Sequence, residues 1–282
     1  MKTASRLAAL LGLAVLSACG NVTSRAQPVF ATSGTKVGPG SEFPTQAVKR
    51  FVLVNGTRSL KDQTIKVSFS ADGQTAYVEQ NHKKYTLPLV APGEFNAGNA
   101  DLIDEITLSD DVHTMFFQDS VGSGYYNGGH LVVGYKTNPA QMSPATRGGS
   151  ATYNGQTRLS VRTMTGNGFS RGSTTLTANF ATGVLNGTMS TTDDAAAGGT
   201  IAIPDATITI NPGGTQNISG NRFSTDLAIA FAPVPGSAVT IGQTGLSGNF
   251  YGVNAASAGG TYWAEGTLNG GLMLIEGAFA AN

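Results

Sequence analysis

The residues with the clearest potential for ligand chemistry lie in the stretch GSGYYNGGHLVVGY, residues 122–135. Tyr125, Tyr126 and His130 are spaced along a glycine-rich loop that leads into a predicted strand. Tyrosine and histidine side chains both ligate haem iron, so these three residues are candidate haem ligands. The alternative, which we favour, is a loop whose aromatic side chains cover the junction between two domains.

A second candidate is a cluster of acidic residues in the stretch NADLIDEITLSDDVH. Its members are Asp101, Asp104, Glu105, Asp110 and Asp111. Hard cations prefer carboxylate oxygens, but the spacing of a calcium-binding EF-hand loop is absent. We therefore interpret the cluster as a solvated acidic loop and expect no metal site there.

The sequence does not indicate catalysis. The three histidines, His82, His113 and His130, occur in separate segments without the spacing of metal ligands. Cys19 is the only cysteine, and it lies in a targeting segment, so a catalytic Cys–His pair is excluded. We expect a non-enzymatic protein without a catalytic residue.

The first twenty residues, MKTASRLAALLGLAVLSACG, have the pattern of a targeting segment. Lys2 and Arg6 form a positive region, and residues 7–16 form an apolar stretch too short to span a bilayer. Residues 16–19, LSAC, resemble a bacterial lipobox, in which the chain is cut before a cysteine that receives fatty-acid (palmitate-type) chains. The alternative is an ordinary secretory signal with a chance cysteine.

We predict that residues 1–18 are a lipoprotein signal peptide and that Cys19 is the lipidation site. Several acyl chains hold a protein on a membrane far more firmly than one chain does. Gly20 stands where an aspartate would favour inner-membrane retention. The expected location is therefore the outer membrane, with the lipid-anchored protein displayed at the cell surface.

Composition narrows the class of protein further. Of the 282 residues, 12% are charged, 40% are hydrophobic and 38 are glycine. The hydrophobic share is sufficient for a packed core. The formal net charge is zero, so the sequence has no excess of basic residues for neutralising phosphates, and we expect no nucleic-acid partner.

The composition changes near the stretch YKTNPAQMSPATRGG, because Lys136 is the last lysine and His130 the last histidine. This shift across a proline-containing link predicts a domain boundary. We expect a flexible tether over residues 19–44, a β-rich handle domain over 45–140 and a β-barrel over 145–282. Short β-branched and aromatic runs separated by turn residues make both domains all-β.

Alternation in the second half predicts a closed antiparallel sheet of about eight strands. Leu176, Ala178 and Phe180 share one face, while threonine and asparagine side chains occupy the other. Asp72-Gly73 and Thr182-Gly183 are the predicted tips of two hairpins. Lysine, the usual guard of an exposed sheet edge, is absent from this half, which favours closure.

The glycine-rich stretch GLSGNFYGVNAASAGGTYWAEGTL surrounds the only tryptophan, Trp263, which we expect to fill or cap the barrel interior. Together with GGSATYNGQTRLSV, TLTANFATGVLNGTMS and IEGAFAAN, this stretch resembles the β-barrel of transferrin-binding protein B. The resemblance covers residues 148–282. It implies a handle-plus-barrel surface lipoprotein of a Gram-negative outer membrane, with room for a single lobe.

The resemblance implies that the protein captures a ligand for uptake, with a TonB-dependent outer-membrane receptor as its partner. The ligand would be a protein, haem or a metal. The related family includes proteins that bind haem and proteins that bind other host proteins. The alternative is a structural or interaction lipoprotein of the cell envelope that transports nothing. Most histidines and basic residues lie in the handle, so we expect a ligand to contact the handle and its junction with the barrel.

Overall fold

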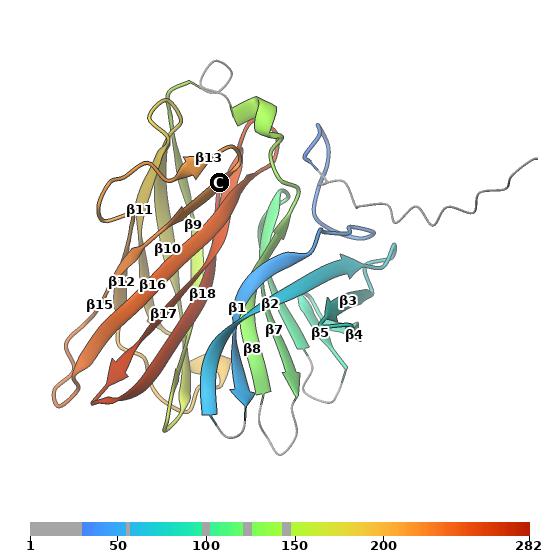
Figure 1. Cartoon of the computed structure of the whole chain (residues 1–282). Helices are drawn as coiled ribbons and strands as arrows, with labels where there is room; N and C mark the ends of the chain where they lie inside the picture. Colours follow the sequence, from blue (N-terminus) through green and yellow to red (C-terminus); the bar gives the residue numbers. More distant parts are fainter. Residues whose placement is uncertain (1–29, 55–56, 98–101, 121–125, 143–147) are drawn as a thin grey trace, which may run out of the picture.

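The computed structural model describes residues 30–282 apart from 55–56, 98–101, 121–125 and 143–147 (Figure 1). The described chain is nearly all strand, with two short 3-10 turns, η1 (Pro139–Met142) and η2 (Ala195–Ala197). This confirms the all-β prediction. Within the described residues, no helix has the length and apolar character needed to cross a membrane. Cys19 lies outside the described residues.

The N-terminal half forms a closed antiparallel barrel, called here the first barrel. Its strands are β1 (Gln46–Val54), β2 (Thr57–Phe69), β3 (Thr75–Gln80), β4 (Lys83–Ala91), β5 (Glu94–Asn96), β6 (Leu102–Ser109), β7 (Val112–Ser120) and β8 (Tyr126–Gly134). Each strand pairs with the next, and β1 meets β8 at one position, Phe51 opposite Gly128. The predicted β-rich handle is therefore itself a barrel.

The predicted hairpin at Asp72-Gly73 is confirmed between β2 and β3. Asp72 Oδ1 accepts hydrogen bonds from the Gln74 amide at 3.0 Å and the Ser70 hydroxyl at 2.6 Å. Gly73 adopts a φ of 71°, a conformation that glycine reaches without steric penalty. The turn thus fixes the register in which Val67 and Val78 pair and point into the barrel core.

The predicted tether over residues 19–44 is too long. From Phe30 onward the chain packs on the first barrel: Phe30 bridges Lys136, and Phe43 is 1% exposed within the barrel core. The apolar residues Ala31, Val37 and Phe43 are sparse, six positions apart, which made the segment resemble a linker, yet burying them stabilises an ordered path. A tether can occupy only the residues before Phe30.

The C-terminal half forms a ten-stranded sheet in the order β13-β14-β16-β17-β18-β9-β10-β11-β12-β15. The strands are β9 (Ser150–Thr163), β10 (Asn167–Asn179), β11 (Val184–Asp193), β12 (Ala206–Ile210), β13 (Ile218–Ser219), β14 (Arg222–Thr225), β15 (Leu227–Phe231), β16 (Val239–Tyr251), β17 (Ser257–Leu268) and β18 (Gly271–Ala281). Only Asp226 separates β14, which lies next to the edge strand β13, from β15 at the opposite edge of the sheet. The sheet thereby curls into the second barrel.

The alternation predicted for the second barrel is confirmed. Leu176 and Ala178 are fully buried, and Phe180 is 6% exposed, whereas Thr175 and Thr177 face solvent. Gly183, at a φ of 70°, forms the tip of the hairpin between β10 and β11. The last strand, β18, pairs with β9, so the end of the chain completes the wall of the barrel.

Candidate ligand-binding site at the junction of the two barrels

The two barrels meet where β1 and β8 of the first lie against β17 and β18 of the second (Figure 1). Two apolar clusters fill this junction. One contains Phe51, Leu60 and Leu274, with Trp263 packed against it; the other consists of Val112, Val132, Tyr251, Ala278 and Ala280. Apolar burial of this kind stabilises a fixed arrangement of the two barrels.

Trp263 does not fill the second barrel, so that prediction is wrong. Its neighbour Tyr262 points inward and is 1% exposed, while Trp263 is half-buried on the outer face. The ring lies over Gly245, where a Cβ atom would come within 2.7 Å of the indole nitrogen. Lys49 Nζ lies 4.7 Å from the ring centroid, so this tryptophan joins the two barrels.

A buried carboxylate, Glu276 on β18, enters the seam between β1 and β8. Its Oε2 atom accepts a hydrogen bond from the His130 amide at 3.1 Å, where only a single β1–β8 residue pair exists. A Cβ atom on Gly129 would lie 2.4 Å from Arg50 Cγ and 3.1 Å from Glu276 Oε2, so the seam has no room for a side chain there. Burial raises the pKa of Glu276 to about 8, although the charges of Arg162 and Arg50 oppose that shift.

Arg50 is fully buried inside the first barrel, at the edge of this seam. Its Nη2 atom donates to Asp119 Oδ1 at 2.8 Å and to the Phe117 carbonyl at 3.1 Å, while Nη1 donates to Gln80 Oε1. A buried guanidinium needs such partners, because desolvating an unpaired charge is strongly unfavourable. These contacts give Arg50 a structural role in the barrel.

His130 lies in the junction and lines a hollow of about 600 Å³ beside Phe116 and Phe169. The side chain is 3% exposed, and its Nε2 atom is 2.9 Å from Ser160 Oγ. Burial, followed by the positive charge of Arg158, lowers the pKa of His130 to about 3, so the ring is neutral at physiological pH. A neutral ring could ligate iron, but its Nε2 atom is already engaged by Ser160, so His130 as placed does not fit haem.

The side chains of the other two predicted ligands are not among those that the structure describes. Tyr125 lies outside the described residues, and the side chain of Tyr126, at the start of β8, does as well. His82 is exposed at the tip of the β3–β4 hairpin, and His113 is buried on β7. Among the described residues, no three His, Cys, Asp or Glu side chains gather as a metal site would require.

The acidic cluster is not a single solvated loop, which corrects the prediction. Asp104 and Glu105 belong to β6, because this segment pairs with β5 and β7 on either side. Asp110 forms an ion pair with Lys36, and Asp111 accepts a hydrogen bond from Ser257 at 3.4 Å across the junction. Asp101 lies outside the described residues.

One stretch, GFSRG at residues 168–172, matches the nucleophile motif G-x-S-x-G. Its chemistry requires a sharp strand-to-helix turn that exposes the serine. Ser170 instead lies inside the extended strand β10 and is 2% exposed. The adjacent Arg171 pairs with Asp194 at 3.5 Å. The motif therefore does not form a nucleophile elbow here.

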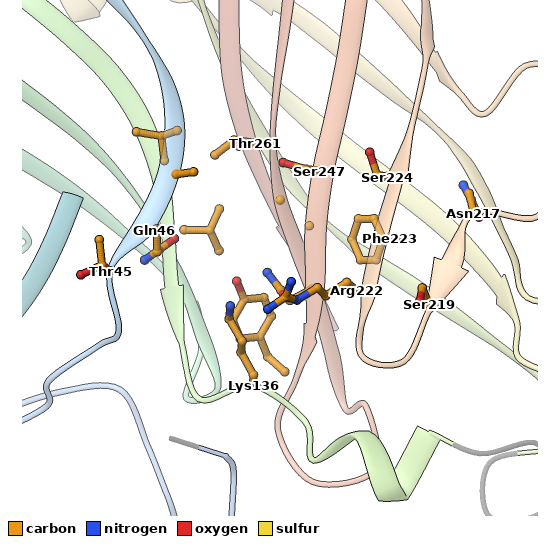
Figure 2. Close-up of a pocket in the computed structure, with 17 residues that line it drawn as sticks. Thr45, Gln46, Lys136, Asn217, Ser219, Arg222, Phe223, Ser224, Ser247 and Thr261 are labelled. Atoms are coloured by element: carbon orange, nitrogen blue, oxygen red, sulfur yellow. The ribbon is translucent and has the colours of Figure 1, made fainter. Parts of the chain in front are cut away.

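A second hollow, of about 380 Å³, opens on another side of the junction, between β1 and β8 and strands β14, β16 and β17 (Figure 2). Lys136, just after β8, and Arg222, at the start of β14, both line it. Their neighbours are mostly hydroxyl and amide side chains: Thr45, Gln46, Asn217, Ser219, Ser224, Ser247, Asn249 and Thr261. None of the described lining residues is acidic.

Sequence reasoning did not identify this second hollow. Lys136 was notable only as the last lysine, and Arg222 is 86 positions further along the chain. Only the pairing of β14 with β16, and the contact of Lys136 with Tyr251, bring the two cations to the same place. A single sequence carries no signal of that approach.

Comparison with known proteins identifies the family. Residues 125–282 match the family described as the C-lobe and N-lobe beta barrels of Tf-binding protein B. No curated protein matches the sequence. Among solved structures, a mutant of the vaccine antigen transferrin-binding protein B from Haemophilus parasuis Hp5 aligns at 17% identity with a TM-score of 0.52, over 84% of this chain and 44% of that chain.

The isotype 1 transferrin-binding protein B from serogroup B Neisseria meningitidis aligns at 18% identity with a TM-score of 0.42, over 79% of this chain and 52% of that chain. The present chain thus spans about half the length of these structures. At such low identity the Haemophilus parasuis structure shows a shared fold alone. By the match over residues 125–282, the chain belongs to the transferrin-binding protein B β-barrel family.

Proposed function

We propose that this protein is a non-enzymatic lipoprotein of the outer-membrane surface that captures a protein ligand for uptake. Membership of a family named for transferrin binding supports a protein ligand. The predicted lipidation of Cys19 supports an anchor at the membrane. A TonB-dependent receptor would be the partner that moves the ligand, or the iron it carries, across the membrane.

The proposal rests chiefly on the outer face of the first barrel. Across β2, β3 and β4, the register places Lys66 opposite Glu79 and Glu79 opposite Lys84. The next row contains Tyr77, which is 44% exposed beside Thr86. An exposed aromatic side chain next to a row of charges is typical of a protein-binding surface, because aromatic anchors supply much of the binding energy and charges supply orientation.

The outer surface of the second barrel carries few charged side chains. Its exposed strand positions carry mainly threonine, serine and asparagine side chains, and only five basic residues follow position 140. Its interior is filled by its own apolar side chains, such as Leu176, Phe250 and Phe279. The first barrel and the junction are therefore the better candidates for recognition.

Calorimetry with iron-loaded transferrin as the probe tests this proposal, using the soluble chain that begins at residue 20. We expect saturable binding that Tyr77→Ala weakens at least about tenfold, the effect of removing an interface anchor. Leu272→Ala is the matched control, because Leu272 is 40% exposed on the second barrel. The absence of binding, or equal weakening by both variants, would contradict capture of transferrin through this face.

Haem is a second candidate ligand, supported by Tyr125 and Tyr126 in the sequence and not by His130, whose Nε2 atom already contacts Ser160. Binding of hemin to the soluble chain would shift its Soret band, and the engagement of His130 with Ser160 leads us to expect the tyrosines to matter more. No spectral change would remove haem. The structural-lipoprotein alternative predicts binding of neither probe.

A further inference from the structure

The hollow lined by Lys136 and Arg222 has an unbalanced charge. Arg222 is exposed and reaches from β14 toward the first barrel, where Lys136 lies half-buried (Figure 2). Both side chains line the same hollow, and burial, followed by the charge of Arg222, lowers the pKa of Lys136. Neither has an ion pair with a described acidic residue, unlike Lys36, Lys49 and Lys66.

Lys136 is half-buried beside Arg222 with no described acidic side chain in the hollow, so a bound anion would relieve the repulsion between the two cations. The chain's N-terminal segment cannot supply the missing charge, because the first acidic residue in the sequence is Glu42. Glu42 itself pairs with Lys66 on β2. The anion that would balance Lys136 and Arg222 therefore comes from outside these elements.

The backbone around the two cations is firmly held. Lys136 forms bridges with Phe30 on one side and Tyr251 on the other. The next residue, Thr137, accepts a 2.6 Å hydrogen bond from Asn221 Nδ2 at its carbonyl and donates through its hydroxyl to the Gly252 carbonyl at 2.8 Å. Asn221 directly precedes Arg222, so this contact fixes the two cationic segments relative to each other, as a preformed site requires.

The remaining lining supplies neutral donors. Ser224 and Ser247 are exposed, Thr261 is half-buried, and no side-chain hydrogen bond to a described residue occupies their hydroxyl groups. Hydroxyl groups can donate to an anionic oxygen, and a guanidinium offers a planar pair of donors to carboxylate, phosphate or sulfate. Cations and neutral donors thus converge on one small volume from which described acidic side chains are absent.

We propose that this hollow binds an oxyanion, namely a carboxylate, phosphate or sulfate group, through Lys136 and Arg222 with the surrounding hydroxyl groups as secondary donors. The site does not depend on the capture of a protein ligand on the outer face of the first barrel. It would hold the anionic group at the junction of the two barrels, in contact with both.

Isothermal titration of the soluble chain with inorganic phosphate, sulfate and acetate, each at matched ionic strength in chloride, tests this site. We expect saturable binding of at least one anion. Arg222→Gln should weaken it at least about tenfold, because a charge-assisted hydrogen bond is lost. Lys136→Met should weaken it similarly. Arg171→Gln, an exposed arginine elsewhere on the second barrel, should leave it unchanged.

The three anions separate the sources of the ligand group. Binding of acetate would indicate a carboxylate ligand, and binding of phosphate or sulfate alone would indicate a tetrahedral oxyanion. Arg222 is exposed, so Arg222→Gln should fold normally, which an unchanged melting temperature would verify. The proposal is overturned by the absence of saturable binding for all three anions, or by binding that Arg222→Gln and Lys136→Met leave unaltered.

Discussion

Replacing Glu276 with glutamine should remove a pH dependence of stability that the buried carboxylate creates. Glu276 is 1% exposed and its folded-state pKa is about 8, against 4.5 for the free side chain. Between these two values the unfolded chain has lost the proton that the folded chain keeps. The contribution of Glu276 to the free energy of unfolding should therefore fall as the pH rises from 4.5 to 8.

His130 contributes a pH dependence of stability with the opposite sign. Its folded-state pKa is about 3, against 6.5 when unfolded, so its contribution to stability is lost as the pH falls from 6.5 to 3. Above pH 6.5, of these two groups, only Glu276 acts. One pKa unit corresponds to about 1.4 kcal/mol, so the wild-type chain should lose about 2 kcal/mol of stability between pH 6.5 and 8.

Urea unfolding of the soluble chain across this pH range measures the effect. The slope should vanish in Glu276→Gln, which keeps the shape of the side chain but cannot ionise. Glu265→Gln, on the neighbouring strand β17 and half-buried, is the matched control and should keep the wild-type slope. A wild-type stability that is constant or rises over this range would refute the reasoning, because it would mean that Glu276 is charged in its buried position.

Three further changes have definite expected outcomes. Cys19→Ala should abolish incorporation of radiolabelled palmitate, and equal labelling of the two proteins would exclude lipidation at this cysteine. Trp263→Ala should lower the free energy of unfolding by about 1 to 3 kcal/mol in urea titrations, because the ring is half-buried; a loss near 5 kcal/mol would instead match full burial. Arg50→Met should lower it by about 3 to 5 kcal/mol, since Asp119 would remain buried without its partner; a neutral effect would show that the pair is dispensable.

Much of the fold could be predicted because local patterns agree with the tertiary structure. The alternation in Leu176, Ala178 and Phe180 reflects burial of one sheet face, and the glycine turns at Gly73 and Gly183 need positive φ angles. Trp263 was misplaced because position in a glycine-rich strand does not say which face of the sheet a side chain occupies. Its inward neighbour Tyr262 is the residue that fills the barrel.

The junction could not be predicted from the sequence. Glu276 and His130 are 146 positions apart, and their hydrogen bond exists because the seam between β1 and β8 leaves an amide free for a carboxylate from the other barrel. Lys136 and Arg222 likewise meet only after both barrels have formed. Such contacts depend on how two curved sheets pack, and one sequence records no trace of that geometry.

The central claim, that the protein captures a ligand for uptake, is tested most directly by growth under iron limitation with iron-loaded transferrin or hemin as the only iron source. A strain that lacks the gene should grow poorly on at least one of them. The wild-type gene should restore growth, and the Cys19→Ala variant should not. Equal growth of the deletion and parent strains on both sources would contradict capture for uptake and favour a structural envelope lipoprotein.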